Sequence, residues 1–310
     1  MRTTDPRPVL PADIVVFERG WLSANNILLH SDTAPVLIDS GYVAHSPQTL
    51  ALVGGALGEQ VLSTLVNTHL HSDHCGGNAA LQTKYPQLAT LIPPGHAEAV
   101  RIWDEVTLSY GPTGQRCDRF VFQGTLQPGS TLRLGRYDWQ IHAAPGHDPH
   151  SVLLFQADLR LLISADALWE NGFGVVFPEI EGESAFQEVA DTLDLIESLQ
   201  PKTVIPGHGA VFSEVNQALV RARERLAYFK ADPARHAKHA AKVLIKFNLM
   251  DHQRFKLADF MRWIAEAAYI PKVFQLHFKN EAFEPWVLGL LQDLQRSGVL
   301  KIENDLLINC

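Results

Sequence analysis

The densest group of chemically reactive side chains lies at residues 67–77, in the stretch Asn-Thr-His-Leu-His-Ser-Asp-His-Cys-Gly-Gly. His69, His71, Asp73 and His74 fall within a window of six residues. Three imidazoles and one carboxylate are costly to bury unless each finds a hydrogen-bond partner or a metal ion. The spacing His-x-His-x-Asp-His favours a metal ion, and more than one of them.

Three other polar residues stand where an apolar run ends beside small or turn-forming residues. His147 follows Ala-Pro-Gly, Asp166 follows Leu-Ile-Ser-Ala, and His208 follows Val-Ile-Pro-Gly. Loops at the ends of strands are common places for reactive side chains on a rigid scaffold. We therefore expect these three residues to complete the group that begins at His69.

The elements that position these residues are predicted from apolar periodicity and turn signals. Short apolar runs predict strands at 14–17, 26–29, 36–38, 61–66, 88–92, 120–122, 131–134, 139–143, 152–155, 161–164 and 204–205. Helical spacing predicts helices at 46–57, 78–85, 94–103, 183–199 and 214–230, and residues 109–118 are predicted to form a loop. Strands that alternate with helices indicate an α/β domain in which helices cover the sheets.

The pattern changes after His208. Helices are predicted at 234–247, 257–268 and 285–295, and a hairpin at 299–302 and 306–308. Helices followed by a small hairpin are typical of a winged-helix-like module, although a plain helical cap over the first domain fits as well. The predicted organisation is a flexible leader at 1–11, a main domain at 12–230 and a C-terminal helical or winged-helix-like domain at 231–310.

The composition is that of an ordinary globular protein. With 310 residues, 46% of them hydrophobic, the chain can build a large core and an appended small domain. No apolar run approaches the roughly 18 to 20 residues that span a bilayer, and the start of the chain lacks a signal-peptide pattern. Three widely spaced cysteines do not indicate a disulfide framework. We therefore predict a cytoplasmic protein without a membrane partner, and the oligomeric state stays open.

Together, these motifs resemble those of the metallo-β-lactamase superfamily of hydrolases, which includes the glyoxalase II thioesterases. The matching segments are Thr-His-Leu-His-Ser-Asp-His74, Pro-Gly-His147, Ser-Ala-Asp166 and Pro-Gly-His208, in the superfamily's order. The early strand that ends in Asp-Ser-Gly41 also matches, and the resemblance extends from about residue 14 to residue 212. It implies a four-layer αββα sandwich with two metal ions between the sheet edges.

The resemblance also assigns the metal ligands. His69, His71 and His147 would hold the first ion, Asp73, His74 and His208 the second, and Asp166 would bridge the two. Zinc is the expected metal because it takes imidazole nitrogen and carboxylate oxygen and leaves a position open for water. Manganese or iron could replace it in such a site. The nucleophile would be a metal-bridging hydroxide, and Asp73 is a candidate proton acceptor.

Other residues near these motifs have weaker assignments. Asp39 is expected to accept the second N–H of a metal-bound histidine, with turn capping as the alternative. Cys75 is expected to be a buried thiol and not a ligand. Candidates for the wall of a substrate pocket are His150, Trp169, Phe173 and Phe177. Strand capping is the alternative for His150, and core packing is the alternative for the three aromatic residues.

The predicted function is hydrolysis of an ester-like bond, with a thioester or a lactone favoured, in a small acyl or anionic substrate. A metal-dependent endoribonuclease is an alternative, because some superfamily members that cleave RNA carry a winged-helix-like extension. The net charge of −8 and the lack of interleaved aromatic and basic residues in the C-terminal part disfavour nucleic acid as a partner. An iron-dependent sulfur dioxygenase is a further alternative, and the complete ligand set argues against a non-catalytic binding protein.

Overall fold

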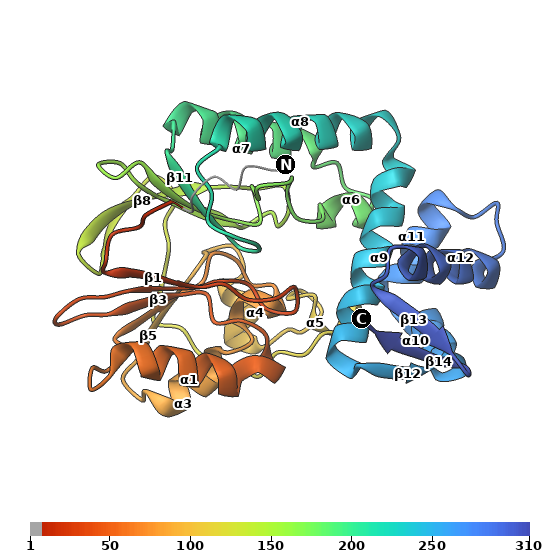
Figure 1. Cartoon of the computed structure of the whole chain (residues 1–310), viewed down its shortest axis with the longest axis horizontal. Helices are drawn as coiled ribbons and strands as arrows, with labels where there is room; N and C mark the ends of the chain where they lie inside the picture. The colour runs from red at the N-terminus through yellow and green to blue at the C-terminus, as the bar shows by residue number, and fades with distance from the viewer. Residues whose placement is uncertain (1–7) are drawn as a thin grey trace, which may run out of the picture.

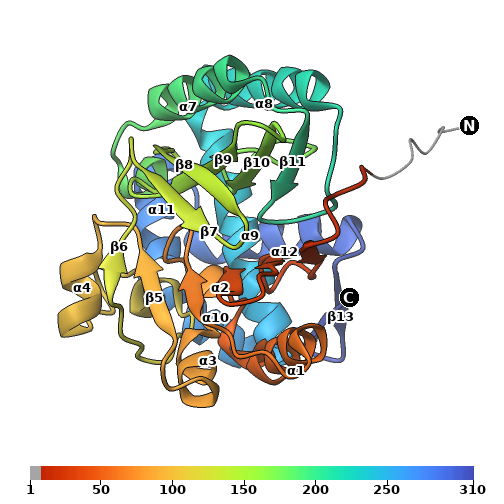
Figure 2. The same cartoon turned by 90° about the vertical axis from the view of Figure 1, so that its left-hand side faces the viewer.

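Two β-sheets pack face to face in the computed structural model, which describes residues 8–310 (Figure 1). Helices cover the outer side of each sheet, so the layers run helix, sheet, sheet, helix (Figure 2). The predicted four-layer αββα sandwich is therefore confirmed. The leader predicted at 1–11 lies mostly outside the described residues, and residues 8–11 carry no helix or strand.

The first sheet contains six strands in chain order. They are β1 (Ile14–Phe17), β2 (Asn26–Leu29), β3 (Val36–Ile38), β4 (Thr64–Val66), β5 (Ala89–Ile92) and β6 (Gly124–Thr125). The strands from β1 to β3 are antiparallel, and those from β3 to β6 are parallel. Leu37 packs toward α1 (Ser46–Leu57) and α3 (Asn78–Lys84), whereas its neighbour Ile38 packs toward the second sheet. Both faces of β2 and β3 are buried, which explains why these central strands are mainly apolar.

The second sheet has the order β11 (Thr203–Pro206), β10 (Leu161–Ala165), β9 (Val152–Gln156), β8 (Tyr137–Ala143) and β7 (Thr131–Leu134). Only β10 and β11 pair in parallel. Leu153 packs toward α7 (Phe186–Leu199) and α8 (Val215–Ala231), whereas Leu154 packs toward the first sheet. The inward side chains of both sheets thus share one core.

The rest of the chain packs against one side of the sandwich. Figure 1 shows α9 (Pro233–His252) along that side, with the last elements beyond it. These are β12 (Arg254–Lys256), α10 (Leu257–Glu266), α11 (Tyr269–His277), α12 (Phe283–Arg296), β13 (Leu300–Glu303) and β14 (Leu306–Asn309). Their core includes Val175 and Ile180 from the sandwich. The chain breaks between helices at Asp232, close to the predicted boundary, and the division into two domains stays a prediction.

Several short elements differ from the prediction. Residues 120–122 form no strand, because Phe120 packs into the cluster of side chains beneath α4 (Ala97–Ile102). The helix predicted at 257–268 ends at Glu266, because the backbone of Ala267 is extended. A separate helix, α11, begins at Tyr269. The structure also contains α5 (Tyr110–Thr113), α6 (Phe177–Glu181) and β12, which we did not predict. Within the described residues, no helix is long and apolar enough to cross a membrane.

Candidate metal centre

The seven predicted ligands lie at one end of the sandwich, where strands from both sheets stop. His69 and His71 follow β4, and Asp73 and His74 lie in the short helix α2 (Ser72–Cys75). The other three, His147, Asp166 and His208, follow β8, β10 and β11. They form two groups of side chains whose potential ligand atoms lie within 4.8 Å of one another: His69, His71 and His147 in one, and Asp73, His74, Asp166 and His208 in the other.

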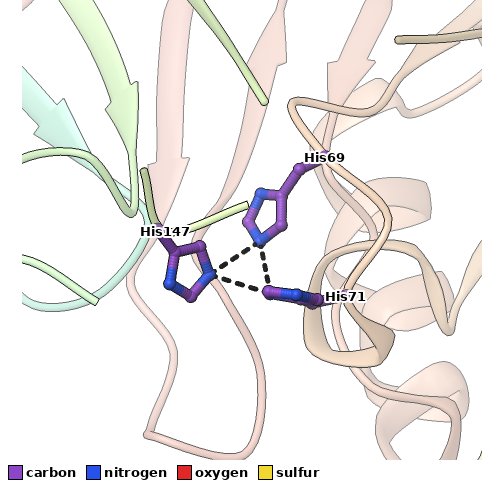
Figure 3. A group of neighbouring side chains, drawn as sticks. All are labelled: His69, His71 and His147. Atoms are coloured by element: carbon purple, nitrogen blue, oxygen red, sulfur yellow. Dashed lines mark hydrogen bonds between the residues drawn. The ribbon is translucent and has the colours of Figure 1, made fainter. Parts of the chain in front are cut away.

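The first group consists of three imidazole rings that point toward one another (Figure 3). The Nε2 atom of His69 lies 3.1 Å from Nδ1 of His71 and 3.3 Å from Nε2 of His147. The third side of the triangle, between His71 Nδ1 and His147 Nε2, measures 2.8 Å. Three nitrogens at this separation can surround one small cation.

The outer nitrogen of each ring faces an acceptor, and this determines where the proton of a neutral ring resides. The Val175 carbonyl lies 2.5 Å from His147 Nδ1 and the Thr68 hydroxyl oxygen 3.3 Å from His69 Nδ1, whereas the Asp148 carboxylate is 3.8 Å from His71 Nε2, near enough for electrostatic attraction. With the protons on the outer nitrogens, three lone pairs converge on one point. Such an arrangement is repulsive without a cation, so this group fits a metal ion.

The electrostatics of this group favour neutral rings. Burial, together with the neighbouring imidazoles, lowers the pKa of His69 well below its usual value. Burial and the charge of His147 lower the pKa of His71 to about 4. Both rings are therefore neutral at pH 7, which is the protonation state that a metal ligand requires.

The second group combines two carboxylates with two imidazoles. His208 Nε2 lies 3.1 Å from Asp73 Oδ2, and His74 Nε2 lies 3.5 Å from Asp166 Oδ1. His74 Nε2 is buried and has no hydrogen-bond partner among the described residues. Asp166 Oδ2 is also 3.4 Å from His147 Nε2 of the first group. Asp166 thus lies between the two groups, and an orphaned ring nitrogen beside paired carboxylates fits a second divalent cation.

In the second group, each carboxylate stabilises the charged form of a neighbouring imidazole, and each imidazole stabilises the charged form of a carboxylate. Burial alone raises the pKa of Asp166, but the charges of His208 and His74 outweigh it and hold that pKa well below the usual value. Burial alone lowers the pKa of His74, but the carboxylates of Asp166 and Asp39 outweigh it and raise that pKa well above its usual value. The group therefore attracts positive charge, which a divalent metal ion can supply in place of a proton.

Asp39 lies behind this group, at the end of β3. Its carboxylate accepts hydrogen bonds from His74 Nδ1 at 2.8 Å, from the Thr68 backbone N–H at 2.9 Å and from the Thr68 hydroxyl at 2.7 Å. The bond to His74 leaves Nε2 of that ring free to face the metal centre. That Asp39 supports a metal-bound His74 in this way stays a prediction. Gly207 is needed nearby, because a Cβ there would collide with the Asp166 carboxylate.

Two tryptophans flank the second group. Trp169 Nε1 donates a hydrogen bond to Asp166 Oδ1 at 3.2 Å. Trp21, which the sequence analysis missed, is 61% exposed and stacks on the His208 ring at a centroid distance of 5.4 Å. Its only sequence signal was its position between the first two strands, in a turn-rich segment. An exposed indole beside a polar cluster can contact a substrate.

The other predicted pocket residues take different positions. Phe177 packs its ring against His71 at 4.6 Å and against His147 at 5.7 Å, beside the first group. Phe173 is only 1% exposed and packs against Phe229, so it is a core residue and not a pocket residue. His150 packs against the His96 ring at 4.5 Å. Of these three, Phe177 is the residue next to the metal centre.

A cavity of about 470 Å³ opens beside His71, between the sandwich and the C-terminal elements. Its polar lining includes His71, His96, Asp148, Glu181, Tyr269 and Lys272. Tyr269 and Lys272 belong to α11, and the Tyr269 hydroxyl donates a hydrogen bond to the Glu181 carboxylate. The C-terminal elements therefore form part of the wall next to the metal centre.

Cys75 is buried and turned away from both groups. Its sulfur lies 3.1 Å from the Tyr110 hydroxyl and 3.8 Å from the Cys117 sulfur. Burial, reinforced by Cys117, raises the pKa of the Cys75 thiol well above its usual value. A neutral thiol in this apolar cluster is a packing residue.

Comparison with known proteins gives a consistent result. A family model described as the metallo-beta-lactamase superfamily matches residues 19–208. The chain is similar to the hydroxyacylglutathione hydrolase of Xanthomonas euvesicatoria, with 27% identity over 72% of this chain and 75% of the relative. It is also similar to the hydroxyacylglutathione hydrolase of Brucella anthropi, with 26% identity over 86% of each chain.

Among solved structures, the fold is similar to that of a metallo-beta-lactamase family protein from Thermus thermophilus. The TM-score is 0.58 at 16% identity, and the match covers 97% of this chain and 100% of the other. The similarity therefore includes the C-terminal elements as well as the sandwich.

Proposed function

The chain belongs to the metallo-β-lactamase superfamily and is a metal-dependent hydrolase, and on this premise we propose that it uses two divalent ions to hydrolyse a thioester or lactone in a small molecule. The observation that carries the proposal is the position of Asp166 between two groups of ligand atoms. The similar bacterial proteins are named for hydroxyacylglutathione, whose acyl group is held in a thioester, and this favours a thioester over a lactone.

In this proposal, His69, His71 and His147 would hold one ion, Asp73, His74 and His208 would hold the other, and Asp166 would serve both. Zinc suits these nitrogen and oxygen donors best, although iron and manganese accept the same donors. Two such ions supply Lewis acidity, because they lower the pKa of coordinated water toward about 7 and polarise the bond under attack.

The side chains have distinct tasks in the reaction. We assign no serine or cysteine nucleophile, and water is the group that attacks the acyl carbon. Asp73, whose pKa is lowered by the charge of His74 and the hydrogen bond from His208 against the opposing effect of burial, is ionised and can accept the proton that this water loses. The carbon–sulfur bond then breaks, the leaving sulfur takes the proton that Asp73 accepted, and the products are a thiol and a carboxylic acid, which releases its proton to solvent as a carboxylate. Asp39 and Trp169 orient His74 and Asp166 during these steps.

Metal content and thioester turnover test this proposal together. We expect elemental analysis to find two zinc ions per chain, and a panel of acyl thioesters and lactones to be hydrolysed at a rate that a chelator abolishes and added zinc restores. If no ester, thioester or lactone shows metal-dependent turnover, the proposal is wrong. One iron per chain together with oxygen consumption would indicate a sulfur dioxygenase instead.

The winged-helix-like assignment of residues 231–310 stays a prediction, and so does the endoribonuclease alternative linked to it. The order of α9, β12, three helices and a hairpin agrees with such a module. Two of its basic side chains, Lys238 and Lys242, are directed to the Asp293 carboxylate at 3.0 and 3.8 Å. The pairing lowers what these two side chains can contribute to binding a phosphate backbone.

A further inference from the structure

The lining of the cavity beside His71 carries more acidic than basic side chains, and this bears on the substrate. We propose that it selects thioesters with an apolar acyl group on an uncharged carrier and disfavours anionic carriers such as glutathione. This inference rests on the proposed thioester hydrolysis and names its substrate class.

The wall of the cavity offers an apolar surface directly beside the metal centre. Leu70 immediately precedes His71, and Phe177 lies against the His71 ring at 4.6 Å. Leu108, Pro112 and Pro149 extend this surface. A volume of about 470 Å³ accommodates a medium-length acyl chain together with part of its thiol carrier. Burial of such a chain against these residues is favourable in proportion to the apolar area removed from water.

The charged groups of the same wall are mostly acidic. Asp148, Glu181 and Glu183 contribute three carboxylates, and Lys272 contributes the single ammonium group. With neutral imidazoles, the formal charge of the lining is therefore about −2. A like charge on the carrier is repelled by this lining, and the partly enclosed surroundings screen that repulsion less than bulk water does.

Two of these carboxylates are held in place. The Asp148 carboxylate accepts the His150 backbone N–H at 2.7 Å and lies 3.8 Å from His71 Nε2. The Glu181 carboxylate accepts a hydrogen bond from the Tyr269 hydroxyl. Lys272, by contrast, is exposed on α11. A carrier with several carboxylates or phosphates would meet two fixed negative charges and only one solvated positive charge.

Glutathione and N-acetylcysteamine form a matched pair of carriers for the test. Glutathione has two carboxylates and one ammonium group, whereas N-acetylcysteamine is uncharged. A hexanoyl thioester of either carrier presents the same acyl group and the same scissile bond to the metal centre. The difference between the two substrates therefore reports on how the site receives the charge of the carrier. The metal centre and the cavity lining both contribute to that difference, and a substitution in the lining separates the two contributions.

With the metal-loaded protein at low ionic strength, we expect kcat/KM for the N-acetylcysteamine thioester to exceed that for the glutathione thioester about tenfold. Half a molar salt should reduce this ratio, because screening acts on charges that are partly exposed. The dissociation constants of the two S-hexyl thioethers, which cannot be hydrolysed, should show the same order when measured by calorimetry. A preference for glutathione in both measurements would overturn the inference.

Reversing the charge of one lining residue tests whether the cavity causes the preference for the uncharged carrier. Glu183→Lys should raise kcat/KM for the glutathione thioester about three- to tenfold relative to the neutral one, as expected for exposed charges. Glu59→Lys is the matched control, since Glu59 is exposed and precedes β4, whereas the metal-binding stretch follows that strand. An unchanged ratio in Glu183→Lys, or an equal change in Glu59→Lys, would contradict the inference.

The two proposals can fail separately. If neither thioester is hydrolysed, the proposed reaction is wrong, while the thioether affinities still decide whether the cavity disfavours the anionic carrier. If both are hydrolysed and glutathione is preferred, the reaction stands and the substrate class is wrong.

Discussion

At the scale of single residues, the stretch from His69 to His74 divides between two groups. His69 and His71 face His147, whereas Asp73 and His74 face Asp166 and His208 (Figure 3 shows the first group). The division arises because His69 and His71 lie on the non-helical segment that follows β4, and Asp73 and His74 lie in the helical turn α2. Neighbours in sequence therefore point in different directions, and one short motif contributes to both halves of the centre.

Asp73→Ala tests this division. Loss of this carboxylate should remove chiefly the second ion, so that elemental analysis falls from two metals per chain to one. The loss of its proton-accepting role should lower kcat/KM by about 100-fold or more. Cys75→Ala is the control at the next-but-one position and should keep both metals, because its sulfur faces Tyr110 and Cys117. Metal loss in Cys75→Ala would show that the thiol supports the centre after all.

At the scale of secondary structure, α9 ties the C-terminal elements to the first half of the chain. Asp251, near the end of this helix, accepts a hydrogen bond from the Tyr42 hydroxyl at 3.0 Å. It also accepts hydrogen bonds from the Arg116 guanidinium at 2.6 and 3.2 Å. Tyr42 is fully buried, and burial together with the Asp251 charge raises its pKa to about 12. The carboxylate thus joins three segments that are distant in sequence.

Asp251→Ala should lower the free energy of unfolding by about 1–3 kcal/mol, because the buried Tyr42 hydroxyl loses its acceptor. Denaturant titration measures this change. Asp194→Ala is the matched control, since Asp194 is 70% exposed and its partner Arg223 retains Glu197. The control should change stability by less than about 0.5 kcal/mol. Equal effects in the two variants would argue against the Asp251 connection.

At the scale of the whole molecule, the core of the C-terminal elements supports the metal centre through one histidine. His236 of α9 is 1% exposed, and its Nε2 accepts the Val176 backbone N–H at 3.0 Å. The adjacent Val175 carbonyl accepts the hydrogen bond from His147. Removal of α9 would therefore free the segment that orients a predicted metal ligand.

This buried histidine predicts a pH dependence of stability. Burial and the nearby Arg225 charge lower the His236 pKa to about 4. The unfolded chain binds this proton near pH 6.5, so the folded state loses stability as the pH falls from 6.5 to 4, by up to about 3 kcal/mol. Above pH 6.5 the full contribution is present. His236→Gln can keep the hydrogen bond from Val176 but has no proton to bind.

Denaturant titrations between pH 4 and 7.5 measure this pH dependence of stability. They compare the original protein with His236→Gln, both freed of metal by a chelator. The stability of His236→Gln relative to the original protein should rise as the pH falls through that window and stay constant above it. A constant difference across the whole range would mean that His236 does not titrate differently in the two states.

Much of the candidate site could be predicted from local sequence because its parts follow strands. Small or turn-forming residues at the ends of apolar runs marked His147, Asp166 and His208, and the alternation of strands with helices indicated sheets covered by helices. Such signals depend on a few consecutive residues. The break at Ala267 and the short helix α6 had no comparable signal, because packing of α11 and α6 on each other and on α9 decides them.

The sequence alone therefore indicated an α/β class and the places of the candidate ligands at strand ends, since periodicity and residue chemistry are local properties. The four-layer αββα arrangement followed from the resemblance of the motifs to a known superfamily. Only the tertiary structure decided what surrounds the candidate ligands. Trp21 meets His208, Lys272 and Tyr269 meet the wall beside His71, and Phe173 turns into the core. These contacts join segments up to some two hundred residues apart, and chain folding, not local preference, brings such segments together.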